Sequence, residues 1–128
     1  MGAQVTVEDL LKRNAQISQN SYPTLPEVPL PNIFIVTCCD PRVDPVEMLG
    51  LERYEATVNR SPAGRIRPHF QGLLFLDQII KFSEIMIIHH TDCSAAVLKS
   101  DDVRTALKTS APGKSSDIDD LVLPGFDE

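Results

Sequence analysis

The sequence has few cysteines, few basic residues and no long apolar run, and each shortage narrows the class of protein. Three of its 128 residues are cysteine, an odd number that does not indicate a disulfide framework. No apolar run approaches the ~20 residues of a membrane-spanning helix, and the N-terminus has no signal-peptide segment. Lysine and arginine (12) are outnumbered by aspartate and glutamate (18), which argues against a nucleic-acid-binding face. We expect a cytoplasmic protein with reduced thiols and with no nucleic-acid or membrane partner.

The rest of the composition is that of one small globular domain. Hydrophobic residues make up 42% of the chain, enough to build a core, and a length of 128 residues suits a single domain. Local changes in composition divide this domain into three parts. We expect an N-terminal helix and proline-rich arm over residues 1–31, an α/β core over 32–109 and a flexible acidic tail over 110–128.

The N-terminal part combines a helix signal with a run of prolines. Thr6 and Asp9 resemble a capping box, which predicts a helix that begins near Val7. Prolines recur between Ser21 and Pro31, where they remove backbone donors and favour extended chain. This segment is either a plain linker or an arm that wraps over a partner subunit.

The central part alternates short apolar runs with helical patterns. The runs at 33–37, 55–58 and 85–88 predict buried strands, whereas 43–51 and 70–82 have helical features. This alternation indicates an α/β fold with a central parallel sheet flanked by helices. In such a sheet the third strand usually lies beside the first, on the side away from the second. Ligands then bind beyond the carboxyl ends of these two strands.

Candidate metal ligands stand at those two strand ends. Cys38 follows the first strand, and His90 and Cys93 follow the third as an H-x-x-C pattern at a strand-to-helix turn. Thiolates and imidazoles are ligands that zinc prefers, and a catalytic zinc site keeps one coordination position open. An H-x-x-C pattern alone is weak. Paired with a cysteine at the end of the adjacent strand, it predicts a Zn²⁺ site.

A carboxylate and a guanidinium follow the first of these cysteines. Asp40 and Arg42 lie two and four residues beyond Cys38 in a C-x-D-x-R stretch. Asp40 is placed to be a fourth metal ligand or a hydrogen-bond acceptor beside the metal, and Arg42 can hold it by a bidentate pair. An ordinary surface ion pair is the alternative.

These two patterns resemble the zinc-binding segments of the β-class carbonic anhydrases. The segments Cys38–Arg42 and His89–Cys93 carry the resemblance. Val43–Pro45, Arg60 and the pair at 63–64 are similar to further family landmarks. The similarity covers most of the chain and is greatest to short microbial and fungal members.

The resemblance implies a zinc enzyme that reversibly hydrates CO2 to bicarbonate and a proton, as a homodimer or higher homo-oligomer. By similarity, Cys38, His90 and Cys93 bind Zn²⁺. Asp40 and Arg42 form the catalytic dyad, and Asp40 becomes the fourth zinc ligand in a closed state. The small-molecule partners are then CO2 and bicarbonate.

Three features depart from the family pattern. Ser94 stands where a glycine usually follows the second zinc cysteine, and residues 60–64 read R-S-P-A-G in place of an R-N-A-G-G-like loop. The sequence stops at Glu128, where short members usually continue into more helix and a closing edge strand, so we expect a shortened C-terminal region. Two alternatives therefore stay open. One is a hydrolase of carbonyl sulfide or carbon disulfide on the same site, and the other is a zinc-binding but inactive protein that acts by association.

Three neighbours of the candidate ligands are assigned structural roles. Cys39 and His89 alternate in direction with Cys38 and His90, so we expect their side chains to leave the strands on the other face and to pack there. Asp92 is expected to cap the helix that follows it.

Overall fold

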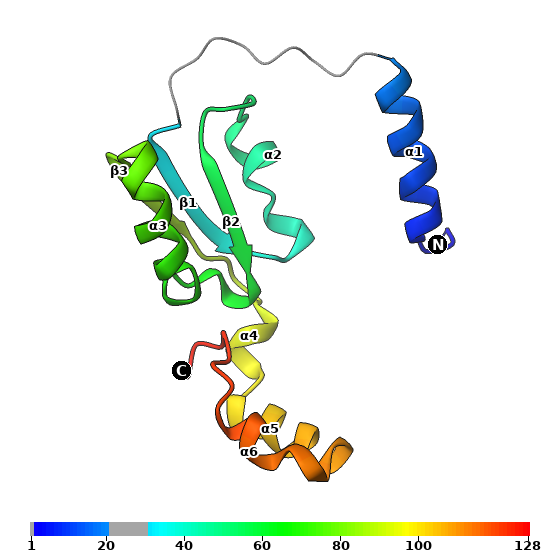
Figure 1. Ribbon diagram of the computed structural model, residues 1–128, viewed down its shortest axis with the longest axis vertical. Coiled ribbons are helices and arrows are strands. Elements are labelled where there is room, and N and C mark those ends of the chain that lie inside the picture. The colour runs from blue at the N-terminus through cyan, green and yellow to red at the C-terminus, as the bar shows by residue number, and fades with distance from the viewer. Residues whose placement is uncertain (1, 21–30) are drawn as a thin grey trace.

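The computed structural model describes residues 2–20 and 31–128, and it begins with a helix that stands apart from the rest (Figure 1). Helix α1 (Val7–Gln19) has the predicted capping box. The hydroxyl of Thr6 accepts a hydrogen bond from the backbone N–H of Asp9, and the Asp9 carboxylate accepts one from the N–H of Thr6. None of the residues of α1 is buried. The predicted proline-rich arm lies almost entirely outside the described residues.

Three parallel strands form the central sheet in the order β2-β1-β3. The strands are β1 (Ile33–Cys38), β2 (Thr57–Ser61) and β3 (Glu84–Ile88). The predicted α/β class is confirmed, and so is the position of the third strand beside the first. The register pairs Cys38 with Ser61 and Thr37 with Ile88. The carboxyl ends of all three strands therefore finish at the same edge of the sheet.

The second strand begins later than the sequence predicted, at Thr57 rather than at Glu55. The backbone N–H of Glu52 donates to the carboxylate of Glu55 at 2.7 Å, and Tyr54 has a positive φ of 72°. Both features belong to a turn, so residues 52–55 cannot extend the strand. Propensity alone did not reveal this turn.

Helices lie on both sides of the sheet (Figure 1). Leu73 of α3 (Phe70–Ile80) packs against Phe34 and Val36 of β1, and these residues form one hydrophobic core. Helix α2 (Pro45–Leu49) lies on the other side of the sheet. The helices predicted over 43–51 and 70–82 are therefore present in shorter form.

A further group of helices lies beyond the carboxyl ends of the strands (Figure 1). It consists of α4 (Ser94–Val97), α5 (Ser100–Ser110) and α6 (Ser115–Asp119). Among the described residues no strand follows β3.

The C-terminal part, predicted as a flexible acidic tail over 110–128, contains helical elements and contacts with distant residues. A 3-10 turn (Pro112–Lys114) and α6 occupy its first half. In the second half, the backbone oxygen of Gly125 accepts a hydrogen bond from Arg65, and the carboxylate of Asp127 accepts from the N–H and hydroxyl of Ser100. Local composition is polar and acidic here, and it contains no sign of these contacts with distant residues.

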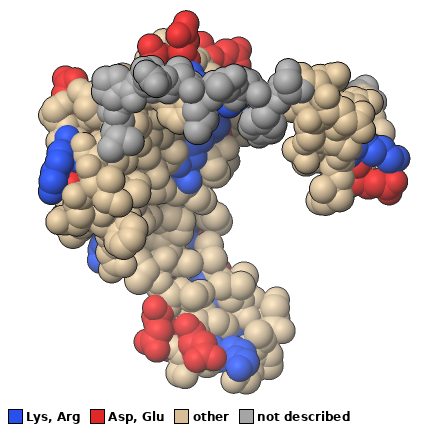
Figure 2. Space-filling model, turned by 45° about the horizontal axis from the view of Figure 1, so that its top comes forward, with Lys and Arg blue, Asp and Glu red and all other residues tan. Residues whose placement is uncertain are grey.

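Large apolar side chains remain exposed on α1, α3 and β3. Examples are Leu11 at 64%, Phe75 at 74% and Ile85 at 51% exposure. On the face shown in Figure 2, basic side chains form small separate groups, and α1 stands clear of the main body. Exposed apolar surface of this kind is typical of contact regions. Within the described part of the chain, none of the helices has the length and apolar character needed to cross a bilayer.

Candidate metal centre

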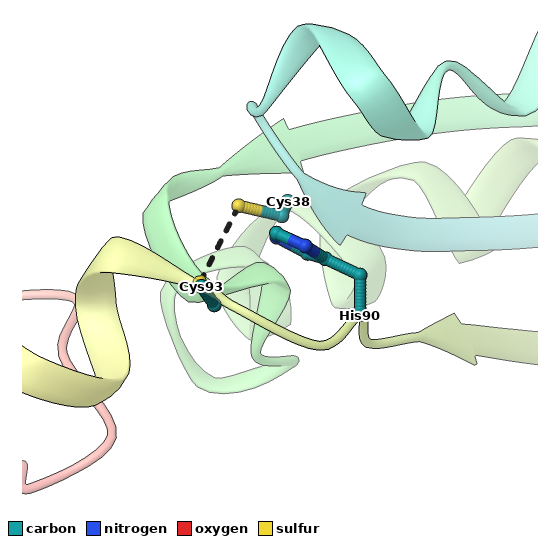
Figure 3. Close-up of side chains that lie close together, drawn as sticks. All are labelled: Cys38, His90 and Cys93. Carbon is teal, nitrogen blue, oxygen red and sulfur yellow. Dashed lines mark hydrogen bonds between the residues drawn. The ribbon is translucent and has the colours of Figure 1, made fainter.

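The three predicted ligands meet where β1 and β3 end (Figure 3). Cys38 is the last residue of β1, His90 follows β3, and Cys93 immediately precedes α4. The hydroxyl of Thr37 donates to the carbonyl of Ile88 at 3.0 Å and ties the two strand ends together. Parallel pairing thus brings residues that are distant in sequence to one point.

The distances within this cluster suit a tetrahedral metal ion. The ligand atoms of Cys38, His90 and Cys93 all lie within 4.8 Å of one another. The two sulfurs are 3.9 Å apart, as the dashed line in Figure 3 marks. Two thiolates bound to one tetrahedral zinc ion at about 2.3 Å lie about 3.8 Å apart. The sulfur separation therefore fits zinc without rearrangement of the cysteines.

The imidazole of His90 is oriented with one nitrogen toward the cluster. Its Nδ1 lies 2.8 Å from the carbonyl oxygen of Thr91, so Nδ1 carries the proton and donates it. Its buried Nε2 has no hydrogen-bond partner among the described residues. A backbone carbonyl on Nδ1 and a free lone pair on Nε2 are the arrangement of a metal-binding histidine.

The thiol of Cys38 has surroundings that favour its anionic form. Burial by itself raises the pKa of Cys38, but hydrogen bonds from the backbone N–H groups of Asp40 and Ala63 and contacts with His90 and Cys93 outweigh it. The pKa of Cys38 therefore lies below the usual value of a thiol. A metal is bound by the thiolate, so a lowered pKa assists binding.

Asp40 lies at the edge of the cluster and is held by Arg42. The guanidinium donates from Nε at 3.1 Å to both carboxylate oxygens and from Nη2 at 2.7 Å to Oδ2, and the backbone N–H of Arg42 donates to Oδ1 at 2.8 Å. These bonds from Arg42 lower the pKa of Asp40 to about 2. Asp40 Oδ2 is 4.0 Å from His90 Nε2. An ionised acceptor thus stands beside the three ligand atoms.

Asp92 takes part in this ion pair instead of capping α4. Its carboxylate lies 3.3 Å from Nη1 of Arg42, and its backbone carbonyl accepts from Nη2 at 3.0 Å. The residue has a positive φ of 57°, which turns the chain between His90 and Cys93. The predicted cap is therefore wrong. Arg42 instead bridges the two segments that carry the candidate ligands, a role that spacing in the sequence does not indicate.

A pocket of about 220 Å³ opens beside the cluster. Its wall combines the site residues with small, mostly apolar side chains, among them Pro62, Ala63, Ser94 and Ala95. Pro62 and Ala63 belong to the departing loop at 60–64, Ser94 is itself a departure from the family pattern, and Ala95 follows it. The pocket is large enough for a small linear molecule.

Two of the neighbours assigned structural roles are exposed. Cys39 is exposed and borders the pocket, so it is not the buried packing residue that strand alternation predicted. The chain leaves the sheet after Cys38, which ends the alternation. His89 is also exposed, and its ring makes an edge-to-face contact with Phe126 at a centroid distance of 5.4 Å.

Gly64 allows the loop after β2 to approach Cys38, and its replacement by alanine is expected to destabilise the protein. Gly64 has a φ of 67°, and a Cβ would lie 2.4 Å from the backbone of both Thr37 and Cys38. We expect Gly64→Ala to lower the free energy of unfolding by more than about 2 kcal/mol, measured by urea denaturation. Gly72→Ala is the control, because a Cβ there meets nothing within 4 Å. Equal urea midpoints for the two variants would contradict this prediction.

The fold and the cluster together define an α/β protein with a Cys2His site for a metal at the ends of two parallel strands. No protein-family model matches the chain. Over 102 residues it is 30% identical to β-carbonic anhydrase 1 of Mycobacterium tuberculosis, an alignment that covers 79% of this chain and 63% of that protein.

Solved structures agree with the sequence comparison. A carbonic anhydrase from Glaciozyma antarctica is 26% identical with a TM-score of 0.76, over 92% of this chain and 71% of that one. A carbonic anhydrase from Streptococcus mutans is 27% identical with a TM-score of 0.74, over 98% and 75%. The chain is thus similar in sequence and in fold to β-carbonic anhydrases, the resemblance that the two sequence patterns predicted. It spans 63% of the length of the curated relatives that it matches.

Proposed function

We propose that the protein reversibly hydrates CO2 to bicarbonate and a proton, with Zn²⁺ held by Cys38, His90 and Cys93. The observation that carries this proposal is the position of Asp40, whose Oδ2 lies 4.0 Å from His90 Nε2 beside three convergent ligand atoms. Zinc bound by three protein ligands lowers the pKa of a bound water to about 7 and so would supply hydroxide at neutral pH. The similarity in sequence and fold to β-carbonic anhydrases supports the same reaction.

The protein's own side chains supply orientation and shape. Arg42 holds Asp40 as an ionised acceptor, because it donates to both carboxylate oxygens. An acceptor fixed at this place holds a proton-bearing nucleophile and directs its lone pair toward the carbon of CO2. The wall formed by Pro62, Ala63 and Ala95 suits CO2, which is linear, apolar and without hydrogen-bond donors.

We also propose a homodimer or higher homo-oligomer in the cytoplasm. Support for the assembly comes from α1, which has no buried residue although it exposes Leu10 and Leu11, and from the exposed Phe75 of α3. A second copy would cover such surface. The free thiols of Cys38 and Cys93 support the cytoplasm, where cysteines stay reduced. Light scattering on protein eluting from a size-exclusion column measures the mass.

A second candidate is the hydrolysis of carbonyl sulfide or carbon disulfide on the same site. Pro62, part of the departing loop at 60–64, lines the pocket, so the altered loop changes the wall against which a substrate would lie. Both compounds are linear and apolar like CO2. The ratio of the three kcat/KM values distinguishes the two activities.

The test is stopped-flow CO2 hydration with zinc-loaded protein at a pH above 8, compared with the same protein after metal removal. We expect a rate clearly above the buffer background that depends on zinc and on protein concentration. A zinc-replete protein that stays at background contradicts the proposal and favours the inactive, associating protein. A larger kcat/KM for carbon disulfide than for CO2 favours the second candidate.

A further inference from the structure

The side chain of Arg60 joins β2 to the segment that carries Cys38 and Asp40. Its Nε donates to the carbonyl oxygen of Cys38 at 3.0 Å, and its Nη2 donates to the carbonyl oxygen of Asp40 at 2.7 Å. Arg60 is half-buried and lies opposite Thr37 in the register of β1 and β2. A single guanidinium thus holds the backbone on both sides of Cys39.

This contact occurs where the chain stops being held by the sheet. Beyond the paired residues of β1 and β2, one more backbone hydrogen bond runs from the N–H of Cys39 to the carbonyl of Ser61 at 3.0 Å. The chain then turns away from the sheet. Beyond that point Arg60 fixes the carbonyl of Asp40 relative to that of Cys38. A planar guanidinium with donors at fixed spacing imposes a distance between two acceptors, which a single ammonium group cannot do.

We infer that Arg60 is a positioning residue, which sets the placement of the Cys38 thiolate and the Asp40 carboxylate relative to one another. Arg60 acts through backbone carbonyls, so it needs no contact with metal or substrate. The inference rests on the proposed metal site. It assigns to Arg60 a role in metal affinity and in coordination geometry, beyond a general contribution to folding.

Arg65 provides a matched control within the same region. It also donates to two backbone oxygens, those of Gly125 and Glu128, but these lie in the C-terminal segment. Loss of either arginine removes a guanidinium from a pair of backbone oxygens and lowers stability. Only loss of Arg60 disturbs the segment of Cys38 and Asp40.

The experiment measures zinc affinity by competition with a chromophoric chelator, and the absorption spectrum of the Co²⁺-substituted protein. We expect Arg60→Gln to weaken zinc binding about 10- to 100-fold, the range found for groups that orient metal ligands. The thiolate-to-cobalt and d–d bands should shift or broaden, because the ligand angles change. Arg60→Lys should retain part of the affinity with an altered spectrum. Arg65→Gln should lower the urea midpoint of the metal-free protein but leave both metal readouts as in the wild type.

Wild-type affinity and spectrum in a folded Arg60→Gln protein would overturn the inference, as would equal losses of affinity in Arg60→Gln and Arg65→Gln. If Arg60→Gln does not fold, Arg60→Lys decides by the same two readouts, and wild-type values there overturn the inference. None of these measurements requires turnover. A wild-type protein that binds zinc but does not hydrate CO2 therefore contradicts the proposed function and still tests the role of Arg60.

Discussion

Alanine in place of Cys38 or Cys93 is expected to abolish stoichiometric zinc binding and nearly all CO2 hydration. Each replacement leaves two of the three convergent ligand atoms, and a catalytic zinc site requires three protein ligands. Metal analysis by mass spectrometry after dialysis should show a fall from about one zinc ion per chain to near zero. Stopped-flow rates should fall to the level of the metal-free protein.

Cys39→Ala is the control for this pair of variants. It removes the same chemical group from the adjacent position, but Cys39 is exposed and lies outside the cluster of ligand atoms. We expect this variant to keep about one zinc ion per chain. The assignment of the ligands is wrong if Cys38→Ala and Cys93→Ala both keep their zinc as well.

Asp40→Asn is expected to keep the zinc and to lose most of the turnover. Asparagine has nearly the same size, but its amide replaces one acceptor oxygen with a donor that faces the donors of Arg42. The group beside His90 Nε2 is then no longer a fixed anionic acceptor. We expect kcat/KM for CO2 to fall about 100-fold or more, the effect of losing a positioned proton acceptor. Stopped-flow kinetics and metal analysis on the same sample measure both quantities.

Asp44→Asn is the matched control, since it makes the same change of charge nearby. Asp44 accepts the backbone N–H of Val46 at 2.9 Å at the start of α2, and asparagine caps a helix about as well as aspartate. We expect zinc content and kcat/KM close to those of the wild type. If Asp40→Asn and Asp44→Asn lowered kcat/KM equally, the cause would be the change in net charge. Full activity in Asp40→Asn would remove Asp40 from the mechanism.

The sheet and the position of the site could be predicted because they follow from local patterns and one topological rule. The apolar runs at 33–37 and 85–88 predict buried parallel strands, and β1 is buried as expected. The strand β3 is present but exposed, because it lies at the edge of the sheet, so that part of the prediction is wrong. In a doubly wound sheet the third strand usually lies beside the first, on the side away from the second. Cys38 and His90 come directly after those strands, and their convergence needs no further information.

The contacts that surround the ligands could not be predicted in this way. The bridge from Arg42 to Asp92 depends on a residue with positive φ, and the carbonyl contacts of Arg60 depend on how the chain turns after Cys39. The C-terminal segment was expected to be flexible because its local composition is polar and acidic. Its contacts are with residues elsewhere in the chain, such as Arg65. Composition reports neither kind of long-range contact.

The closeness of the two sulfurs has a consequence for handling the protein. Cys38 and Cys93 are 3.9 Å apart as free thiols, and a bound metal would occupy the space between them. Once a chelator removes the metal, a two-electron oxidant can take two electrons from the two thiols, which release their protons and join as a disulfide, after which reloading with zinc would fail. Metal-free samples therefore need a reductant throughout, and a loss of activity on storage should be reversed by reduction followed by zinc.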